Sequence, residues 1–232
     1  SSGNLSGACA VDAAGRIIDE RMLGSDDDII DWIKSHLAAR TVVAIDAPLQ
    51  VPNETGRRPC ETELSRDYGS RKAGPHSSNR SLLMGIHRLI RGEEIAARLA
   101  YLGFGDPWAG SIRTVLEAYP HPAIIEAFGL PERLIYKAKK GVSVADRRRG
   151  LRTLSCLIAT LADATPPLHG PSVSIDDSVR GAALKAVEDR LDARICAWVA
   201  AIWGQKPSQI RLYGDGETGH IAVPVGRFSK DG

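Results

Sequence analysis

The stretch Thr41-Val42-Val43-Ala44-Ile45-Asp46-Ala47-Pro48-Leu49 decides the fold class predicted from this sequence. It opens with a short apolar run rich in β-branched residues, which is typical of a strand buried on both faces. Pro48 cannot continue a hydrogen-bonded ladder, so the strand should end at Asp46. Asp46 then lies at the carboxyl end of a central strand, the edge where open α/β sheets bind ligands. The same aspartate could instead cap the turn that follows.

The composition is that of an ordinary folded domain. The 232 residues are 43% apolar and 25% charged, and we expect one domain over residues 1–232. The net charge of +2 gives no global basic field, so a nucleic-acid partner would have to be recognised by local patches. The four cysteines contain no C-x-x-C pair, which favours reduced thiols in a cytoplasmic protein over a zinc or redox site. No apolar run reaches membrane-spanning length.

The chain before this strand predicts a β-hairpin and a helix. Residues 8–12 and 16–23 read as two strands joined by a turn at Gly15. Ser25 and the acids at 26–28 precede apolar residues at helical spacing. The three consecutive aspartates point in different directions, so they favour a helix start over a metal site.

A long polar segment follows Asp46. Residues 48–80 are rich in proline, glycine and arginine, including Arg57 and Arg58, with a short helix expected at 60–68. An insertion of this length is usually functional or disordered, so it could fold over a site at Asp46 or form a solvated basic loop. Residues 81–102 predict one helix with an apolar face.

The second half of the chain repeats the pattern of an acid near a strand end. Residues 112–119 predict a strand that carries Glu117 near its carboxyl end, and a short helix is expected at 122–128. Arg147, Arg148 and Arg149 lie near the start of an expected long helix. They could form a patch that contacts phosphates, or they could be the solvated start of that helix. The residues at 210–213 and 220–224 predict a terminal hairpin.

The helix expected at 188–203 brings two further carboxylates together. Asp192 borders its apolar stripe, and Asp189 is its i, i+3 neighbour, so both can reach one region. An acidic pair beside a core stripe is costly unless it is paired or binds a cation.

These carboxylates predict a hard-cation site. Asp46, Glu117, Asp189 and Asp192 supply the oxygen ligands that Mg²⁺ or Mn²⁺ prefers. Such ions, about 4 Å apart, can stabilise the attacking and leaving oxygens of a phosphodiester displacement. No G-x-S-x-G, H-E-x-x-H or Walker loop supports a rival mechanism.

Five motifs in this order resemble one known family. They are VAIDAPL at 43–49, RRPCE at 57–61, LEAYP at 116–120, LDARICA at 191–197 and YGDGETG at 213–219. The chain resembles, over nearly its whole length, the domain-of-unknown-function family four-hundred-and-twenty-nine, whose members are thought to be ribonuclease-H-like nucleases. The resemblance implies an α/β, ribonuclease-H-like mixed sheet with helices on both faces and an elaborated loop and helix insertion.

The resemblance also implies roles for individual residues. Asp46, Glu117 and Asp192 match acidic family positions as catalytic groups, and Asp46, Asp192 and, more weakly, Asp189 match metal-binding ones. Arg57, Arg58 and Arg147 to Arg149 match basic positions that would bind substrate. Ribonuclease-H-like enzymes also carry an acid on their first strand, and we expect that strand to lie upstream of Ser1. The alternative is that this acid is missing from the protein, which would leave the metal site incomplete.

Three functions are consistent with these residues. The first is a divalent-metal-dependent nuclease that acts on DNA or RNA. The second is a catalytically inactive nucleic-acid-binding or scaffold protein on the same fold. The third is a metal-dependent enzyme acting on a small phosphorylated or acidic metabolite.

Overall fold

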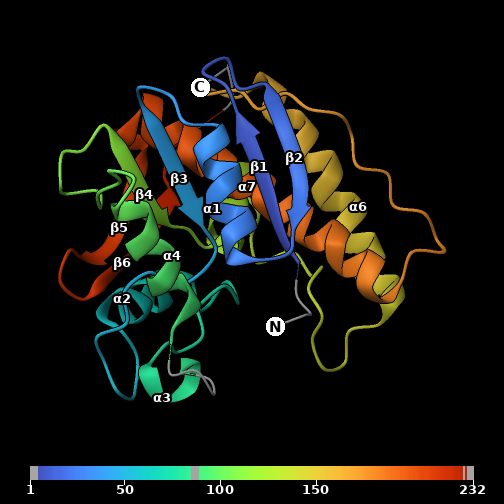
Figure 1. Ribbon diagram of the computed structural model, residues 1–232. Helices are drawn as coiled ribbons and strands as arrows, with labels where there is room; N and C mark the ends of the chain where they lie inside the picture. Colours follow the sequence, from blue (N-terminus) through green and yellow to red (C-terminus); the bar gives the residue numbers. More distant parts are fainter. Residues whose placement is uncertain (1–4, 85–88, 227, 229–232) are drawn as a thin grey trace.

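The computed structural model describes residues 5–84, 89–226 and 228, and its strands form three two-stranded ladders (Figure 1). β1 (Ser6–Val11) pairs antiparallel with β2 (Ile17–Leu23), and β5 (Ile210–Asp215) pairs antiparallel with β6 (Gly219–Pro224). β3 (Thr41–Ile45) pairs parallel with β4 (Arg113–Glu117) in register, with Ile45 opposite Glu117. An isolated bridge between Ala118 and Ala222 links the end of β4 to β6. The predicted strands and both hairpins are therefore confirmed, with ends that shift by one or two residues.

One central strand is less buried than its sequence predicts. β3 is half-buried at every position, as is β1, whereas β6 is buried throughout and β4 is buried from its second residue. The expectation that the strand at 41–46 is buried on both faces is therefore wrong. The physical reason is that β3 has a partner on one edge only, and in the described ranges no backbone pairing joins it to β1.

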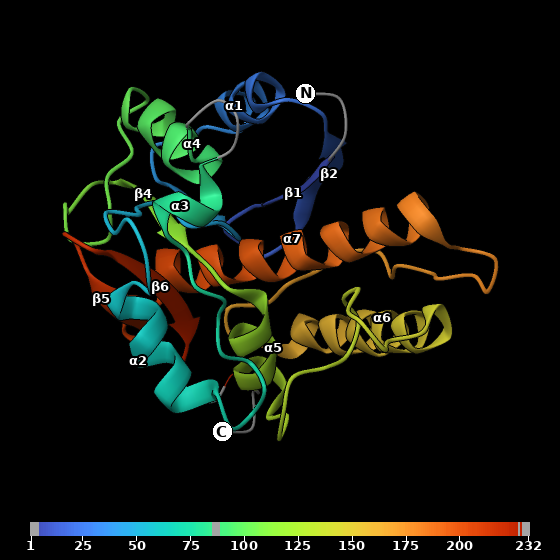
Figure 2. The same ribbon diagram turned by 90° about the horizontal axis from the view of Figure 1, so that it is seen from below.

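Helices cover both faces of the strands (Figure 2). They are α1 (Asp26–Ser35), α2 (Pro59–Tyr68), α3 (Arg80–Leu83), α4 (Arg91–Ala100), α5 (Pro120–Phe128), α6 (Val144–Thr160) and α7 (Gly181–Gln205). α7 packs against β1, β3, α5 and α6, and α1 packs against α4 on the opposite face. The chain thus has a mixed α/β fold, as its sequence indicates, and in its described parts no helix is long and apolar enough to cross a membrane.

α7 organises the larger part of the core. Leu191, Ile195 and Trp198 on this helix are fully buried, and the indole N–H of Trp198 donates to the Pro166 carbonyl over 2.9 Å. The helix begins at Gly181, seven residues before the start expected from the apolar stripe. β1 lies so close to α7 that a Cβ added at Gly7 would be 2.3 Å from the carbonyl oxygen of Asp189.

The helix predicted at 81–102 is wrong as one continuous element. α3 ends at Leu83, the backbone of Met84 and Ile90 is extended, and α4 starts at Arg91. Residues 85–88 of the predicted helix lie outside the described residues. α4 is fixed by a close approach to the turn after β3, because a Cβ at Gly92 would be 2.0 Å from the Pro48 carbonyl oxygen. Tertiary packing therefore overrides the local helical pattern here.

Candidate functional site

Two of the predicted carboxylates meet at one lysine. Asp46 follows β3 directly, and Asp192 lies on the middle of α7. The Nζ of Lys137 lies 2.8 Å from Oδ2 of Asp192 and 3.4 Å from Oδ2 of Asp46. The neighbouring Tyr136 hydroxyl donates to Oδ1 of Asp192 over 2.7 Å. The segment between α5 and α6 thus supplies both a cation and a hydroxyl to carboxylates from β3 and α7.

Asp192 is much more buried than Asp46. The Asp192 side chain is 9% exposed, whereas that of Asp46 is 37% exposed. Burial raises the pKa of Asp192 from its ordinary value to about 6, and the Asp46 carboxylate adds to the increase while Lys137 opposes it. Burial acts to lower the pKa of Lys137, but Asp192 and Asp46 together raise it above its ordinary value. Lys137 is therefore positively charged. Burial also raises the pKa of Asp46 above its ordinary value while Lys137 opposes the increase, so the two carboxylates titrate as a pair above the usual range for aspartate.

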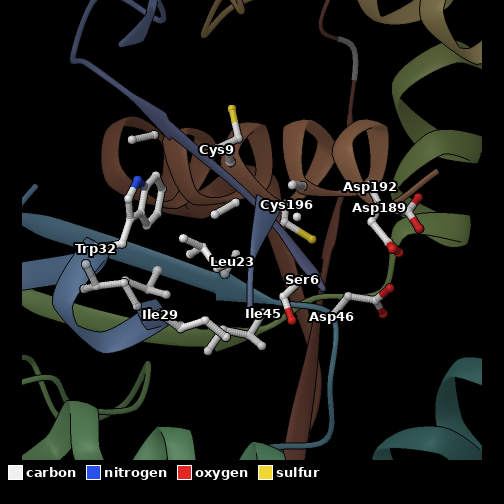
Figure 3. Close-up of a pocket in the computed structure, with 18 of the residues that line it drawn as sticks. Ser6, Cys9, Leu23, Ile29, Trp32, Ile45, Asp46, Asp189, Asp192 and Cys196 are labelled. Carbon is white, nitrogen blue, oxygen red and sulfur yellow. The ribbon is translucent and has the colours of Figure 1, made fainter. Parts of the chain in front are cut away.

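Asp189 is close to this pair but has its own partner. It forms an ion pair with Lys185, which also lies 3.1 Å from the Glu188 carboxylate. Asp46, Asp189 and Asp192 lie together at one end of a cavity (Figure 3). This cavity of about 640 Å³ runs between β1 and β3, with α1 and α7 as its other walls, and we call it the interstrand cavity.

Glu117 is engaged in a separate buried ion network. Arg58 donates from Nη1 to Oε2 over 2.8 Å and from Nη2 to Oε1 over 2.5 Å, and both side chains are almost fully buried. The backbone N–H of Leu49 donates to the same carboxylate over 3.0 Å. Burial raises the pKa of Glu117, and Arg58 opposes that increase. In this arrangement Glu117 holds the turn that follows Asp46. We call Lys137, Asp46, Asp192 and Tyr136 the Lys137 cluster, and none of the described hydrogen bonds of Glu117 reaches it.

The arginines predicted to bind substrate have partners within the chain. Arg58 also donates to Glu61 over 3.0 Å, and Arg57 donates to the Pro75 carbonyl over 2.7 Å. Arg147 lies 3.1 Å from the Glu188 carboxylate, and Arg148 donates to the Val179 carbonyl over 2.8 Å. These contacts order the segment 50–80 and the start of α6, so a substrate would have to share these side chains.

Tyr136 and Lys137 are not predicted as site residues from the sequence. Lys137 lies in a stretch with other basic residues, and no periodicity separates a lysine that faces two carboxylates from its solvated neighbours. Lys139 and Lys140, two and three residues further on, are exposed. One indirect signal is present: an acidic pair beside the stripe of α7 requires partners, and these are Lys137 for Asp192 and Lys185 for Asp189.

Two of the described carboxylates lie where they could bind a metal ion together. Among residues 5–84, 89–226 and 228, no group of three or more His, Cys, Asp or Glu side chains is placed to hold a metal ion. Asp46 and Asp192 offer two hard carboxylates, and Mg²⁺ commonly binds through one or two protein carboxylates while keeping several waters. The donor set therefore fits such an ion, provided that Lys137 moves aside.

A comparison with family models confirms the family that the sequence motifs indicate. The chain belongs to the family described as "Protein of unknown function (DUF429)", whose model matches residues 3–218. No curated protein and no solved structure matches the chain. Family membership is thus shown, and the family's description names no activity.

Proposed function

We propose that this protein is a divalent-cation-dependent nuclease with a ribonuclease-H-like arrangement, in which Asp46 and Asp192 hold Mg²⁺ or Mn²⁺. The observation that carries the proposal is the convergence of these two carboxylates, from distant parts of the chain, on a single cationic nitrogen. A position that two carboxylates already share with an ammonium group has the charge and the oxygen donors that a small divalent cation needs.

The chemistry rests on where charge develops during phosphodiester cleavage. A bound divalent cation would polarise the phosphodiester and activate a water molecule. The residues of this chain would contribute orientation: Tyr136 fixes Asp192 through its hydrogen bond, and Glu117 fixes the turn after Asp46 through Leu49. Lys137, when it yields its position between the carboxylates, would remain close enough to pair with a phosphate oxygen.

Exposed basic residues support an anionic polymer as substrate. Lys139 and Lys140 follow Lys137 closely, and Arg149 is exposed at the start of α6. Side chains of this kind bind backbone phosphates without reading base sequence. DNA and RNA are both compatible with such contacts, so both are included in the assays below.

A manganese-dependent cleavage assay tests the proposal. Wild type should cleave a labelled single-stranded or duplex oligonucleotide only when Mg²⁺ or Mn²⁺ is present. Asp46→Asn and Asp192→Asn should each abolish cleavage and reduce the Tm increase that Mn²⁺ produces in wild type. Asp27→Asn is the matched control, because Asp27 is an exposed residue at the start of α1 paired with Arg98. Equal Mn²⁺ responses in all three variants and wild type would rule out the proposed site.

One observation favours a second candidate, a protein that keeps the fold without the chemistry. Lys137 already pairs with Asp192 over 2.8 Å and lies 3.4 Å from Asp46, so the cluster has a cation even with no metal ion. A scaffold of this kind would bind nucleic acid through its exposed lysines and show no Mn²⁺-dependent change in Tm or cleavage. The same thermal-shift series therefore separates the two candidates.

A further inference from the structure

His121 is a buried histidine with an unused hydrogen-bonding nitrogen. The residue is 6% exposed, and among the described residues its buried Nδ1 has no hydrogen-bond partner. Burying a polar nitrogen without a partner costs free energy, and such groups in folded proteins are rare enough to require an explanation. A ligand that bonds to the ring would remove that cost.

The His121 ring lies one side chain away from the Lys137 cluster. It packs edge-on between two tyrosines, with ring centroids 5.6 Å from Tyr119 and 5.3 Å from Tyr136. Tyr136 in turn donates its hydroxyl to Asp192. His121 also belongs to the first turn of α5, which packs against α7 and carries no acidic residue in that turn (Figure 2). The start of a helix favours a negatively charged ligand.

Positive charge gathers around the same ring. Burial lowers the pKa of His121 to about 3, and the nearby charges of Lys137, Arg133 and His76 act in the same direction. Burial raises the pKa of Tyr119, and Lys137 and Arg133 oppose that increase. The Arg133 guanidinium therefore lies near both rings. Among the described residues, no hydrogen bond or ion pair occupies this guanidinium or the Tyr119 hydroxyl.

We propose that Tyr119, His121 and Arg133 form a binding site for a terminal phosphate group, next to the Lys137 cluster. Arginine binds phosphate through paired, charge-assisted hydrogen bonds, and a tyrosine hydroxyl and an imidazole N–H add two further donors. A terminal phosphate has more negative charge and one more free oxygen than a phosphodiester. Because His121 is buried, a phosphate at the end of a molecule reaches it more easily than one with a nucleoside on each side.

The phosphate could belong to the end of a nucleic-acid strand or to a small phosphorylated molecule. We assign it to a strand end, because the exposed Lys139 and Lys140 follow closely and would hold further phosphates. This assignment rests on the proposed nuclease function, whereas the phosphate site itself does not. With its terminal phosphate at His121, a strand would present a phosphodiester near its end to Asp46 and Asp192.

Binding of labelled oligonucleotides without metal tests the site. The probes are single-stranded thymidine oligonucleotides with a 5′-phosphate, with a 3′-phosphate or with hydroxyl groups at both ends, and EDTA prevents cleavage. Fluorescence anisotropy should show that wild type binds one of the phosphorylated oligonucleotides about tenfold more tightly than the unphosphorylated one. This is the effect expected of one charge-assisted hydrogen bond.

Two variants and a matched control locate this preference. Arg133→Met removes the guanidinium, and His121→Phe removes the ring nitrogens while keeping an aromatic ring between the two tyrosines. Each should reduce the tenfold preference to less than about threefold. Arg40→Met should leave it unchanged, because Arg40 is exposed and precedes β3, at the opposite end of that strand from Asp46. Circular dichroism and the Tm establish that the variants are folded.

NMR of the histidine rings gives a second readout in the wild-type protein. Titration with inorganic phosphate should shift the signals of the His121 ring. The signals of His169 should not move, because His169 is exposed beside the turn at Gly15, with its backbone N–H donating to the Gly15 carbonyl over 2.7 Å. Equal shifts at both histidines would indicate non-specific binding of phosphate and overturn the site.

The remaining outcomes separate this site from the proposed nuclease function. Equal binding of phosphorylated and unphosphorylated oligonucleotides, or a preference that survives in both variants, would overturn the site even if Mn²⁺-dependent cleavage is observed. A preference without any cleavage would keep the site and remove the nuclease function. If thymidine monophosphate binds as tightly as the phosphorylated oligonucleotide, the site is confirmed and its assignment to a strand end is wrong.

Discussion

The Lys137 ammonium lies 2.8 Å from the Asp192 carboxylate, which is buried on α7 and carries a pKa of about 6. This pair joins a segment outside regular secondary structure to the longest helix of the core. Removing one partner of a buried ion pair leaves the other charge buried and uncompensated. The fold then loses more stability than the attraction between the two groups alone contributed. The predictions below follow from this pair and from the second buried pair at Glu117.

Lys137→Met should destabilise the protein by about 3 kcal/mol at pH 8, where Asp192 would be left ionised and unpaired. The loss should be smaller at pH 5, because Asp192 can then take up a proton. Urea unfolding at both pH values measures the difference. Lys34→Met is the control, since Lys34 pairs with Asp31 on the exposed surface of α1 and should cost no more than about 1 kcal/mol at either pH. The prediction fails if the two variants lose the same stability.

Lys137→Met should also increase the response to metal. With the ammonium removed, Asp46 and Asp192 repel each other, and a divalent cation relieves that repulsion. The Mn²⁺-induced increase in Tm should therefore be larger than in wild type at the same concentration. An unchanged or smaller increase would indicate that the two carboxylates do not form a cation site.

Cation binding should depend on pH through Asp192. Protons and metal ions compete for this carboxylate, so Mn²⁺ affinity should increase as pH rises through about 6 and level off above it. The stability of the metal-free protein should change with pH in the opposite direction. The pKa of Asp192 is higher in the folded than in the unfolded protein, so this group stabilises the fold fully below its unfolded pKa. That contribution is lost as pH rises through about 6. Calorimetric titration and Tm measurements from pH 4 to 8 check both, and Asp192→Asn should flatten both profiles.

Glu117→Gln should act on stability and not on the charge of the Lys137 cluster. Among the described residues, the substitution leaves buried Arg58 with Glu61 as its one charged partner, so we expect a loss of about 3 kcal/mol in the free energy of unfolding. Glu132→Gln, at an exposed ion pair with Lys72, is the control and should change it by less than about 1 kcal/mol. A carboxyl pKa of Asp192 measured by NMR should remain near 6 in Glu117→Gln. A large change in that pKa would place Glu117 within the metal cluster.

Salt dependence should distinguish phosphate contacts from structural arginines. If Lys140 contacts one phosphate, Lys140→Ala should reduce the slope of log affinity against log salt by about one unit. Arg148, which donates to the Val179 carbonyl, should affect the slope less when changed to alanine. Fluorescence anisotropy with a labelled oligonucleotide over a salt series makes the comparison, and equal slopes for wild type and Lys140→Ala would remove Lys140 from the interface.

The sequence predicts the elements of this fold better than the contacts of its site. The strand before Asp46 and the apolar stripe of α7 depend on local periodicity, so both are recovered, although α7 starts earlier than expected. The break between α3 and α4 depends on packing against the turn at Pro48, which no local pattern reveals. Asp46 and Asp192 could be linked through a known family, but Lys137 could not, because its role is defined only by two residues distant in sequence.

Gly7 connects the cavity to the acidic cluster. A Cβ at this position would lie 2.3 Å from the carbonyl oxygen of Asp189, so β1 can pack this closely against α7 only because residue 7 is glycine. Gly7→Ala should therefore push β1 away from this turn of α7 and alter the surroundings of Asp189 and Asp192, and the Mn²⁺-induced increase in Tm should be smaller than in wild type.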